Sequence, residues 1–450
     1  MRIHFIAIGG SAMHNLAIAL HKKGYQISGS DDVIFEPAKS RLDKYGLLPA
    51  EMGWNESRIS TDLDAVILGM HARIDNPELL KAQELGVKIY SYPEYIYEQS
   101  KNKLRVVIGG SHGKTTITSM ILHVLNYYNR DFDYLVGAQL AGFETMVKVT
   151  EEAPVMIIEG DEYLSSPIDR RPKFHLYKAN VAVISGIAWD HINVFPTYAD
   201  YTAQFDKFIN TIEEDGTLIY CKEDADLNEI VENSKARIQK IGYAIPEHEI
   251  INGITYLLPE KTALKVFGDH NLMNMNAAKL VCAQLNIKEA EFNEAISSFT
   301  GAAKRLEVIS ADESTNVYKD FAHSPSKLKA TIDAVKSQFT NRKLVACIEL
   351  HTFSSLNKDF LKEYAGSMDK ADDAIVFIDL KSFEQKRMEP FNENDVQDAF
   401  SNPNLKFFND AAKLKSYLLS QNYKDTNLLM MSSGNYAGFD LPELSAELPR

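Results

Sequence analysis

The chain has 450 residues, of which 45% are hydrophobic and 24% are charged, and its formal net charge is −14. Single hydrophobic cores rarely grow beyond about 250–300 residues, so a chain of this length is expected to form about three domains. The acidic balance argues against non-specific nucleic-acid binding, which needs a basic surface, but it allows a small anionic substrate that meets a few local cations.

The first segment, residues 1–98, begins like a nucleotide-binding unit of alternating strands and helices. Residues 3–8 are apolar apart from His4, which is typical of a buried parallel strand. A glycine turn follows and leads into an amphipathic helix that is expected to end at Gly24. Further strands of the same sheet are expected at residues 25–30, 65–68 and 87–90.

The turn after the first strand predicts a nucleotide site. Its glycine pattern is incomplete, because Ala7, Gly9 and Ala12 stand where a dinucleotide fingerprint has three glycines. Asp31 follows the second strand about 20 residues after the turn, where a carboxylate can accept a hydrogen bond from a ribose hydroxyl. The pattern alone leaves two ligands open, a nicotinamide dinucleotide and a uridine diphosphate group.

The second segment, residues 99–300, opens with the most specific motif of the chain. A short β-rich run at residues 104–108 is followed by Gly110-Ser111-His112-Gly113-Lys114-Thr115-Thr116 and then by an amphipathic helix. This order predicts a phosphate-binding loop, in which helix-start N–H groups and Lys114 face the anion and the Thr115 hydroxyl binds Mg²⁺. The loop is shorter than a full Walker motif, because Ile108 stands where the first glycine is usual. The motif indicates an enzyme that uses a nucleoside triphosphate.

Acidic residues follow the next strand of this segment. The apolar run at 154–158 ends in Glu159-Gly160-Asp161-Glu162, and carboxylates just beyond a parallel strand lie where such sheets bind ligands. We therefore expect Glu159 to share the Mg²⁺ with Thr115, although a solvated loop acid would fit the same pattern. His191 fits a ligand or a packed histidine, and Asn271, near the start of a later helix, fits a helix cap or a contact with a base.

The third segment, residues 301–450, has the pattern of another αβ layer structure. A strand near 317–320 runs into a turn and a helix at 326–339, and further buried strands are expected at 344–350, 374–378 and 428–431. The sequence thus predicts an α/β protein of three domains. They are an N-terminal Rossmann-like domain, a central P-loop ATPase-type domain and a C-terminal Rossmann-like domain with a parallel sheet.

Cysteine content and hydropathy indicate the compartment. Cys221, Cys282 and Cys347 lie far apart, without a Cys-x-x-Cys pair, and suit buried residues in a reducing environment. The chain has no run of about 18 apolar residues that would span a membrane. We therefore expect a cytoplasmic protein.

Taken in order, these motifs resemble those of the Mur ligases, the ATP-dependent ligases of peptidoglycan precursor synthesis, over essentially the whole chain. The phosphate-binding loop is similar to that of the members that bind muramate. The other matching stretches are residues 158–163, 190–191, 268–271, 305–307 and 320–325. The resemblance implies a ligase that uses ATP and Mg²⁺ and binds UDP-N-acetylmuramate.

Within the family, the chain resembles the branch that joins a salvaged tripeptide, L-Ala-γ-D-Glu-meso-diaminopimelate, to UDP-N-acetylmuramate in peptidoglycan recycling. Residues 162–163, 169–174 and 320–325 carry this resemblance. Residues 349–353, Glu-Leu-His-Thr-Phe, instead resemble the branch that adds L-alanine. The C-terminal domain is implied to bind the incoming amine. We therefore expect the tripeptide as substrate, with L-alanine as the alternative.

The resemblance also implies roles for individual residues. The residues implied to be catalytic are Lys114, His191 and His323. Those implied to bind ATP are residues 110–116 of the loop together with Asn271, Arg305 and Asp320. Those implied to hold Mg²⁺ are Thr115, Glu159 and His191. Those implied to bind the UDP part of the substrate are Gly9, Gly10, Ser11, Asp31, His71 and Asn76.

Two functions outside ligation stay open on the sequence. An NAD-dependent oxidoreductase would use the N-terminal unit but leave the phosphate-binding loop without a task. A regulatory ATPase would hydrolyse ATP whether or not a UDP sugar is present. As partners we expect small molecules, with no nucleic acid and no membrane, and we expect a monomer or a weak dimer.

Overall fold

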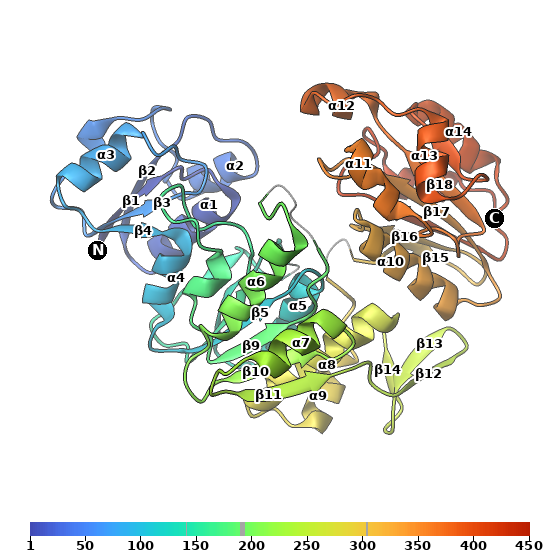
Figure 1. Cartoon of the computed structure of the whole chain (residues 1–450), viewed down its shortest axis with the longest axis horizontal. Coiled ribbons are helices and arrows are strands. Elements are labelled where there is room, and N and C mark those ends of the chain that lie inside the picture. The colour runs from blue at the N-terminus through green and yellow to red at the C-terminus, as the bar shows by residue number, and fades with distance from the viewer. Residues whose placement is uncertain (141, 190–193, 303–304) are drawn as a thin grey trace. The chain divides into compact units, whose positions relative to one another are not determined.

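Sheets rich in parallel strands, with helices packed on their faces, organise the chain (Figure 1). This computed structural model describes residues 1–140, 142–189, 194–302 and 305–450. Contacts group the chain into two units, one of residues 1–244 with 274–295 and the other of residues 245–273 with 296–450. The expected α/β class is confirmed, whereas the expected boundaries at residues 98 and 300 stay predictions.

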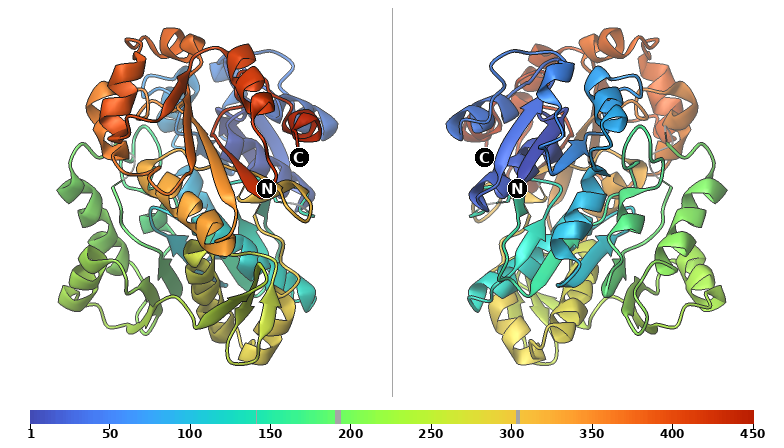
Figure 2. Two further views of the ribbon diagram at one scale, coloured as in Figure 1. Left: turned by 90° about the vertical axis from the view of Figure 1, so that its right-hand side faces the viewer. Right: turned by 90° about the vertical axis from the view of Figure 1, so that its left-hand side faces the viewer.

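The first sheet has four parallel strands in the order β2-β1-β3-β4, which Figure 2 shows in blue. The order reverses between β1 and β3, so the loops after these two strands lie at the edge where folds of this type bind ligands. The strands are β1 (Arg2–Ile6), β2 (Gln26–Ser30), β3 (Ala65–Leu68) and β4 (Ile89–Ser91). The helices are α1 (Ser11–Lys22), α2 (Ala38–Lys44), α3 (Pro77–Glu84) and α4 (Tyr92–Ser100).

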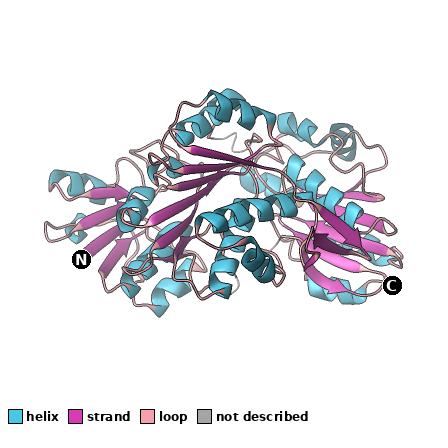
Figure 3. Ribbon diagram, turned by 90° about the horizontal axis from the view of Figure 1, so that it is seen from below, coloured by secondary structure: helices cyan, strands magenta, loops and turns pink. Residues whose placement is uncertain are grey.

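The central sheet has seven strands in the order β11-β10-β9-β5-β8-β6-β7, all parallel except β7. Figure 3 shows helices on both of its faces. Its strands are β5 (Leu104–Gly109), β6 (Asp133–Leu135), β7 (Val147–Lys148), β8 (Val155–Glu159), β9 (Val181–Ile184), β10 (Thr217–Cys221) and β11 (Gln239–Tyr243). Its helices include α5 (Lys114–Tyr127), α6 (Tyr198–Ile209), α7 (Ala225–Asn233) and α9 (Glu289–Ile296).

The register of β5 and β8 brings the two central motifs together. Ile108 pairs with Glu159, so the acidic run leaves β8 beside the phosphate-binding loop that leaves β5. Both strands are almost wholly buried, because a parallel sheet covered on two faces selects apolar residues along its whole length. The buried sheet therefore fixes the starting points of both loops.

The second unit contains a six-stranded sheet in the order β15-β16-β20-β17-β18-β19, in which only the pair β15 and β16 is antiparallel. Its strands are β15 (Glu307–Ala311), β16 (Asn316–Asp320), β17 (Lys343–Glu349), β18 (Asp373–Phe377), β19 (Lys406–Phe408) and β20 (Thr426–Met431). The helices of this region are α10 (Pro325–Gln338), α11 (Lys358–Leu361), α12 (Leu380–Lys386), α13 (Glu393–Phe400), α14 (Ala411–Ser420) and α15 (Leu441–Glu447).

A small antiparallel sheet precedes these strands in the chain. It is formed by β12 (His248–Ile251), β13 (Ile254–Leu257) and β14 (Thr262–Leu264), and α8 (Asp269–Gln284) follows it. The sequence did not predict this sheet, because its strands have only three or four residues and give too short an alternation to recognise.

Two further features are the state of the cysteines and the character of the helices. All three cysteines are free and buried, and burial raises the pKa of the Cys347 thiol above its usual range. Among the described residues, no helix combines the length and the apolar character that a membrane crossing needs.

Candidate active site

The loop from Gly110 to Thr116 has the backbone geometry of a phosphate cradle. Gly110 and Gly113 have φ angles of +119° and +81°, which side chains other than glycine rarely adopt. A Cβ atom on Gly113 would collide with the side chain of Asn274. Helix α5 begins at Lys114, so the N–H groups of its first turn, which lack helical carbonyl partners, lie beside the loop.

The end of β9 holds this loop in place. The backbone N–H and the Oγ of Ser111 donate to the carbonyl oxygen of Gly186, at 2.9 and 3.0 Å. The Ser185 hydroxyl donates to the carbonyl oxygen of His112. The loop therefore keeps its shape through protein contacts.

Lys114 forms a buried ion pair inside the loop. Its Nζ lies 2.9 Å from both carboxylate oxygens of Glu162, whose side chain is 0% exposed, and 2.5 Å from the carbonyl oxygen of Gly110. Burial on its own would lower the pKa of Lys114, but the charge and hydrogen bond of Glu162 outweigh it and raise the pKa. Lys114 is therefore a cation at neutral pH.

Glu159 and Thr115 form the second feature of the site. The Thr115 hydroxyl donates to Glu159 Oε1 at 2.7 Å, and the N–H of Gly137 donates to Glu159 Oε2 at 2.8 Å. Burial raises the pKa of Glu159, because the hydrogen bonds from Gly137 and Thr115 and the charge of Lys114 only partly replace its hydration. A buried carboxylate in this state would be stabilised by a cation.

The donor atoms of this pair suit Mg²⁺. A hydroxyl and a carboxylate are hard oxygen donors, and Mg²⁺ commonly takes one or two protein ligands together with substrate phosphates and water. Within the described ranges, no group of three or more histidine, cysteine, aspartate and glutamate side chains is placed to hold a metal. Thr115 and Glu159 therefore fit a metal shared with a phosphate. The third expected ligand, His191, lies outside the described residues.

Asp161 takes part in a separate pair. Lys173 Nζ donates to Asp161 Oδ2 at 2.7 Å. Burial would raise the pKa of Asp161, but the charge and hydrogen bond of Lys173 lower it overall. Asp161 is thus ionised and neutralised by Lys173, which leaves Glu159 as the acid that faces Thr115.

The N-terminal turn is fastened by Asp31. Its Oδ2 accepts from the N–H of Gly9 at 2.7 Å, and its Oδ1 accepts from the N–H of Asp32 at 3.0 Å. Burial raises the pKa of Asp31 to about 6. The structure therefore gives Asp31 a role in shaping the turn of Gly9, Gly10 and Ser11, and its role toward a ribose stays a prediction.

The two other residues expected at the UDP end lie after β3. His71 is exposed, whereas Asn76 is buried at the N-terminus of α3. The Asn76 Oδ1 accepts from the N–H groups of Glu78 and Leu79, at 3.0 and 3.2 Å. Asn76 thus caps α3, and a contact of its amide with the substrate stays a prediction.

The expected nucleotide residues of the second unit gather around the end of β16. Asp320 accepts from the N–H groups of Leu306 and Ala322, each at 2.7 Å. The Arg305 guanidinium lies 4.8 Å from the centre of the Phe321 ring, and His323 Nδ1 lies 2.8 Å from the Phe321 carbonyl oxygen. The backbone therefore fixes Asp320, with Arg305 and His323 nearby.

Asn271 lies in the first turn of α8, also in the second unit. Its Nδ2 donates to the carbonyl oxygen of Phe267 at 2.9 Å, so the side chain contacts the preceding loop through its amino group. This contact differs from the helix cap that the sequence left open, because a cap would accept from a helix N–H group. A contact of Asn271 with adenine stays a prediction.

The sequence did not predict two contacts of the central site. Glu162 was part of the recognised acidic run, but its pairing with Lys114, 48 positions away, was not expected. Gly137 gave no signal, because its contribution is a backbone N–H group that any residue carries. Both contacts depend on the tertiary structure.

Three family models match successive parts of the chain. The models are the Mur ligase family, catalytic domain, at residues 2–103, the Mur ligase middle domain at residues 108–282, and the Mur ligase, glutamate ligase domain, at residues 304–434.

Similar proteins cover almost the whole chain. A UDP-N-acetylmuramate–L-alanine ligase of Clostridium botulinum (strain Loch Maree / Type A3) is 31% identical over 95% of this chain and 94% of its own. The UDP-N-acetylmuramate-alanine ligase MurC of Thermotoga maritima has a similar structure, with a TM-score of 0.68 and 21% identity. The match covers 97% of this chain and 96% of the Thermotoga chain. A murein peptide ligase of Psychrobacter arcticus matches with a TM-score of 0.63 and 21% identity, over 99% of this chain and 98% of its own.

These relatives overturn the expected tripeptide substrate. The curated proteins that match at 28–31% identity over most of the chain carry the name of the L-alanine-adding ligase. The murein peptide ligase is similar at 21% identity, which supports a common fold only. The assignment to the tripeptide-joining branch was therefore wrong.

Proposed function

We propose that this chain, which belongs to the Mur ligase family, joins the carboxylate of UDP-N-acetylmuramate to the amine of L-alanine. Mur ligases are ATP-dependent ligases that form carbon–nitrogen bonds in peptidoglycan biosynthesis, and this chain is such an enzyme. The observation that carries the proposal is Lys114 at the start of α5, next to the buried pair of Thr115 and Glu159. The L-alanine substrate is supported by the names of the relatives.

The loop residues would neutralise the triphosphate. Lys114 would move its ammonium from Glu162 to the phosphate oxygens, and the N–H groups of the first turn of α5 would bind the same oxygens. Thr115 and Glu159 would hold Mg²⁺, which when bound supplies positive charge against the phosphates. These groups would allow two anions, a carboxylate and a triphosphate, to approach each other.

The reaction follows from the weak electrophilicity of a carboxylate. A carboxylate oxygen of the muramyl group would attack the γ-phosphorus of ATP, which releases ADP and leaves an acyl phosphate. The amine of L-alanine would then attack the acyl carbon and expel phosphate, leaving an amide. The chain contributes chiefly by positioning the reactants and stabilising charge.

The N-terminal turn is the proposed site of the uridine diphosphate group. It joins a buried parallel strand to the N-terminus of α1, where N–H groups favour an anion. The N–H of Gly9 bonds to Asp31, which fixes the turn before a ligand arrives.

The mass of the reaction product tests the proposal. The enzyme is incubated with ATP, Mg²⁺, UDP-N-acetylmuramate and either L-alanine or the tripeptide. We expect the mass of UDP-N-acetylmuramoyl-L-alanine with L-alanine and unchanged UDP-N-acetylmuramate with the tripeptide. A product formed with the tripeptide alone, or ADP formed at the same rate without UDP-N-acetylmuramate, would contradict the proposal.

A further inference from the structure

Asn15 lies in the interior of α1 and uses both ends of its amide. Its side chain is 0% exposed, although burying an asparagine in a helix is unfavourable both in helix propensity and in desolvation. Its Nδ2 donates to the carbonyl oxygen of Ser11 at 2.8 Å, and its Oδ1 accepts from the N–H of Met146 at 2.9 Å. Asn15 therefore joins the turn expected to bind UDP to a loop of the central sheet.

The loop at Met146 continues to the proposed metal site. The carbonyl oxygen of Met146 accepts from the N–H of Val136 at 2.9 Å, and the next residue, Gly137, donates to Glu159 at 2.8 Å. Glu159 accepts in turn from Thr115 at 2.7 Å. Hydrogen bonds of ordinary length and short covalent segments thus connect Ser11 to Thr115 without a gap.

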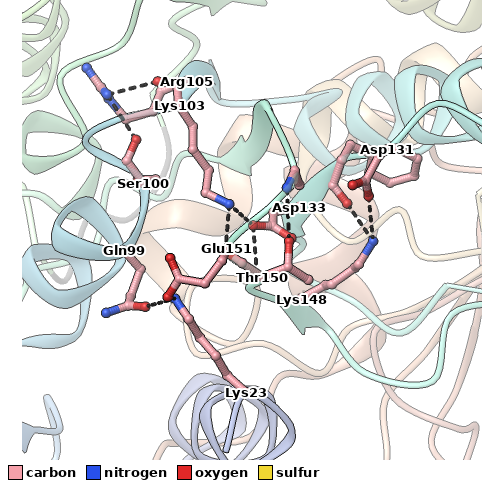
Figure 4. Close-up of polar contacts among 12 residues, drawn as sticks. Lys23, Gln99, Ser100, Lys103, Arg105, Asp131, Asp133, Lys148, Thr150 and Glu151 are labelled. Atoms are coloured by element: carbon pink, nitrogen blue, oxygen red, sulfur yellow. Dashed lines mark hydrogen bonds and ion pairs between the residues drawn. The ribbon is translucent and has the colours of Figure 1, made fainter. Parts of the chain in front are cut away.

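The C-terminal end of α1 is fastened to α4 at Gln99 and to the following chain at Glu144 and Glu151. Lys23 donates to Gln99 at 2.8 Å and forms an ion pair with Glu151 at 2.7 Å, as Figure 4 shows. Lys22 pairs with Glu144 at 2.6 Å, and the hydroxyl of Tyr45 also donates to Glu144. Helix α1 thus contacts residues 144–146 at two points, Asn15 and Lys22. A shift of the first turn of α1 would therefore be transmitted to this segment, called the Met146 segment.

We propose that Asn15 is a positioning residue that links the substrate turn to the metal-binding carboxylate, so that UDP-N-acetylmuramate and the Mg²⁺–nucleotide complex favour each other's binding. The link rests on the proposed function, since it takes the turn at Ser11 as the site of the UDP group. Asn15 would affect the orientation of Glu159 and would not itself contact the reacting groups.

The physical basis is preorganisation. A diphosphate on the N-terminal turn restricts Ser11, which restricts the Asn15 amide and then the hydrogen bonds of Met146 and Val136. The N–H of Gly137 then holds Glu159 in the orientation that faces Thr115. A carboxylate that is already oriented loses less freedom when it binds a metal, and such coupling acts equally in both directions.

The wild-type enzyme gives the first test. Isothermal titration calorimetry measures the dissociation constant of Mg²⁺–ADP with and without saturating UDP-N-acetylmuramate. We expect UDP-N-acetylmuramate to tighten Mg²⁺–ADP binding by about fivefold or more. Equal constants, with UDP-N-acetylmuramate shown to bind, overturn the link but leave the proposed function intact. Failure of UDP-N-acetylmuramate to bind overturns both.

Variants test the role of Asn15 itself. In Asn15→Ala the ratio of the two constants is expected to fall to about one, as for uncoupled sites. Asn293→Ala, which removes another buried helical asparagine, is the matched control and is expected to keep the wild-type ratio. A wild-type ratio in Asn15→Ala, or a loss of coupling in Asn293→Ala as well, would overturn the assignment.

A second variant covers the case in which Asn15→Ala does not fold. Glu144 is largely exposed and fastens the Met146 segment to α1 and α2 through Lys22, Lys44 and Tyr45. In Glu144→Ala we expect a folded protein whose ratio of Mg²⁺–ADP constants is at least about twofold smaller than in the wild type. An unchanged ratio would contradict the link.

Discussion

Replacing Lys114 with methionine separates its role toward phosphate from its role in the folded protein. The ammonium lies 2.9 Å from both oxygens of Glu162, and the two side chains are 15% and 0% exposed. Removing one partner of a buried ion pair destabilises a protein by about 3–5 kcal/mol. Lys114→Met should therefore lower the free energy of unfolding by about this amount.

The double variant Lys114→Met/Glu162→Gln removes the charge on both sides. Replacing both members of a buried ion pair is often nearly neutral, so most of the lost stability should return. Turnover should not return, because the phosphates still lack the ammonium. Loss of one such electrostatic contact costs about 10²–10³-fold in kcat.

Urea unfolding followed by circular dichroism measures the stability, and phosphate release in the presence of all three substrates measures turnover. Lys103→Met is the matched control. Lys103 Nζ lies 2.6 Å from a carboxylate oxygen of the buried Asp133 (Figure 4), and this ion pair is not part of the phosphate-binding loop. This control should be destabilised yet keep turnover within about tenfold of the wild type. Wild-type turnover in either Lys114 variant would refute the phosphate assignment.

Two further changes probe the metal and nucleotide sites. In Gly137→Ala the added Cβ would lie 2.6 Å from Glu159 Oε1, so we expect Mg²⁺ to bind at least about tenfold more weakly, and titration of Mg²⁺ in the activity assay should show this loss. An unchanged dependence of activity on Mg²⁺ concentration would contradict the proposed role of Glu159 as a metal ligand. Because burial raises the pKa of Asp31 from 3.8 to about 6, the folded state holds its proton more tightly than the unfolded state. The contribution of Asp31 is therefore present below about pH 4 and lost as the pH rises through about 6, by at most about 3 kcal/mol, and Asp31→Asn should flatten the unfolding free energy over this range.

The buried strands of the fold were predictable from the sequence, whereas the short ones were not. Residues 181–184 and 428–431 are continuous apolar runs and form β9 and β20, and residues 104–108, which are apolar apart from Arg105, form β5. The strand expected from residue 87 begins at Ile89 instead. Short or partly exposed strands such as β11 and β19 depend on pairing with a neighbour, which a local pattern does not reveal.

The site was predictable where chemistry is carried by a local motif. Lys114 and Thr115 stand in one loop, and the strand before Glu159 could be read from its apolar run. The contributions of Gly137 and Asn15 were not predictable. Gly137 acts through its backbone N–H group, and Asn15 acts through a partner, Met146, that is more than a hundred positions away in the sequence.

The wrong choice of amine rested on residues that have structural roles within the protein. Glu162 pairs with Lys114, and Asp320 accepts from the N–H groups of Leu306 and Ala322. Residues that hold the protein's own loops carry little information about the amine, whereas the stretch at 349–353 had pointed to L-alanine. Similarity over the whole chain was needed to decide between the branches.

In the proposed reaction, ATP activates the muramyl carboxylate as an acyl phosphate. An isotope-labelling experiment tests this step. UDP-N-acetylmuramate labelled with oxygen-18 in its carboxylate is incubated with ATP, Mg²⁺, L-alanine and the enzyme, and the mass of the released phosphate is measured. We expect the released phosphate to carry one labelled oxygen, because that oxygen bridges the acyl carbon and the phosphorus in the intermediate. Release of unlabelled phosphate together with product would contradict it.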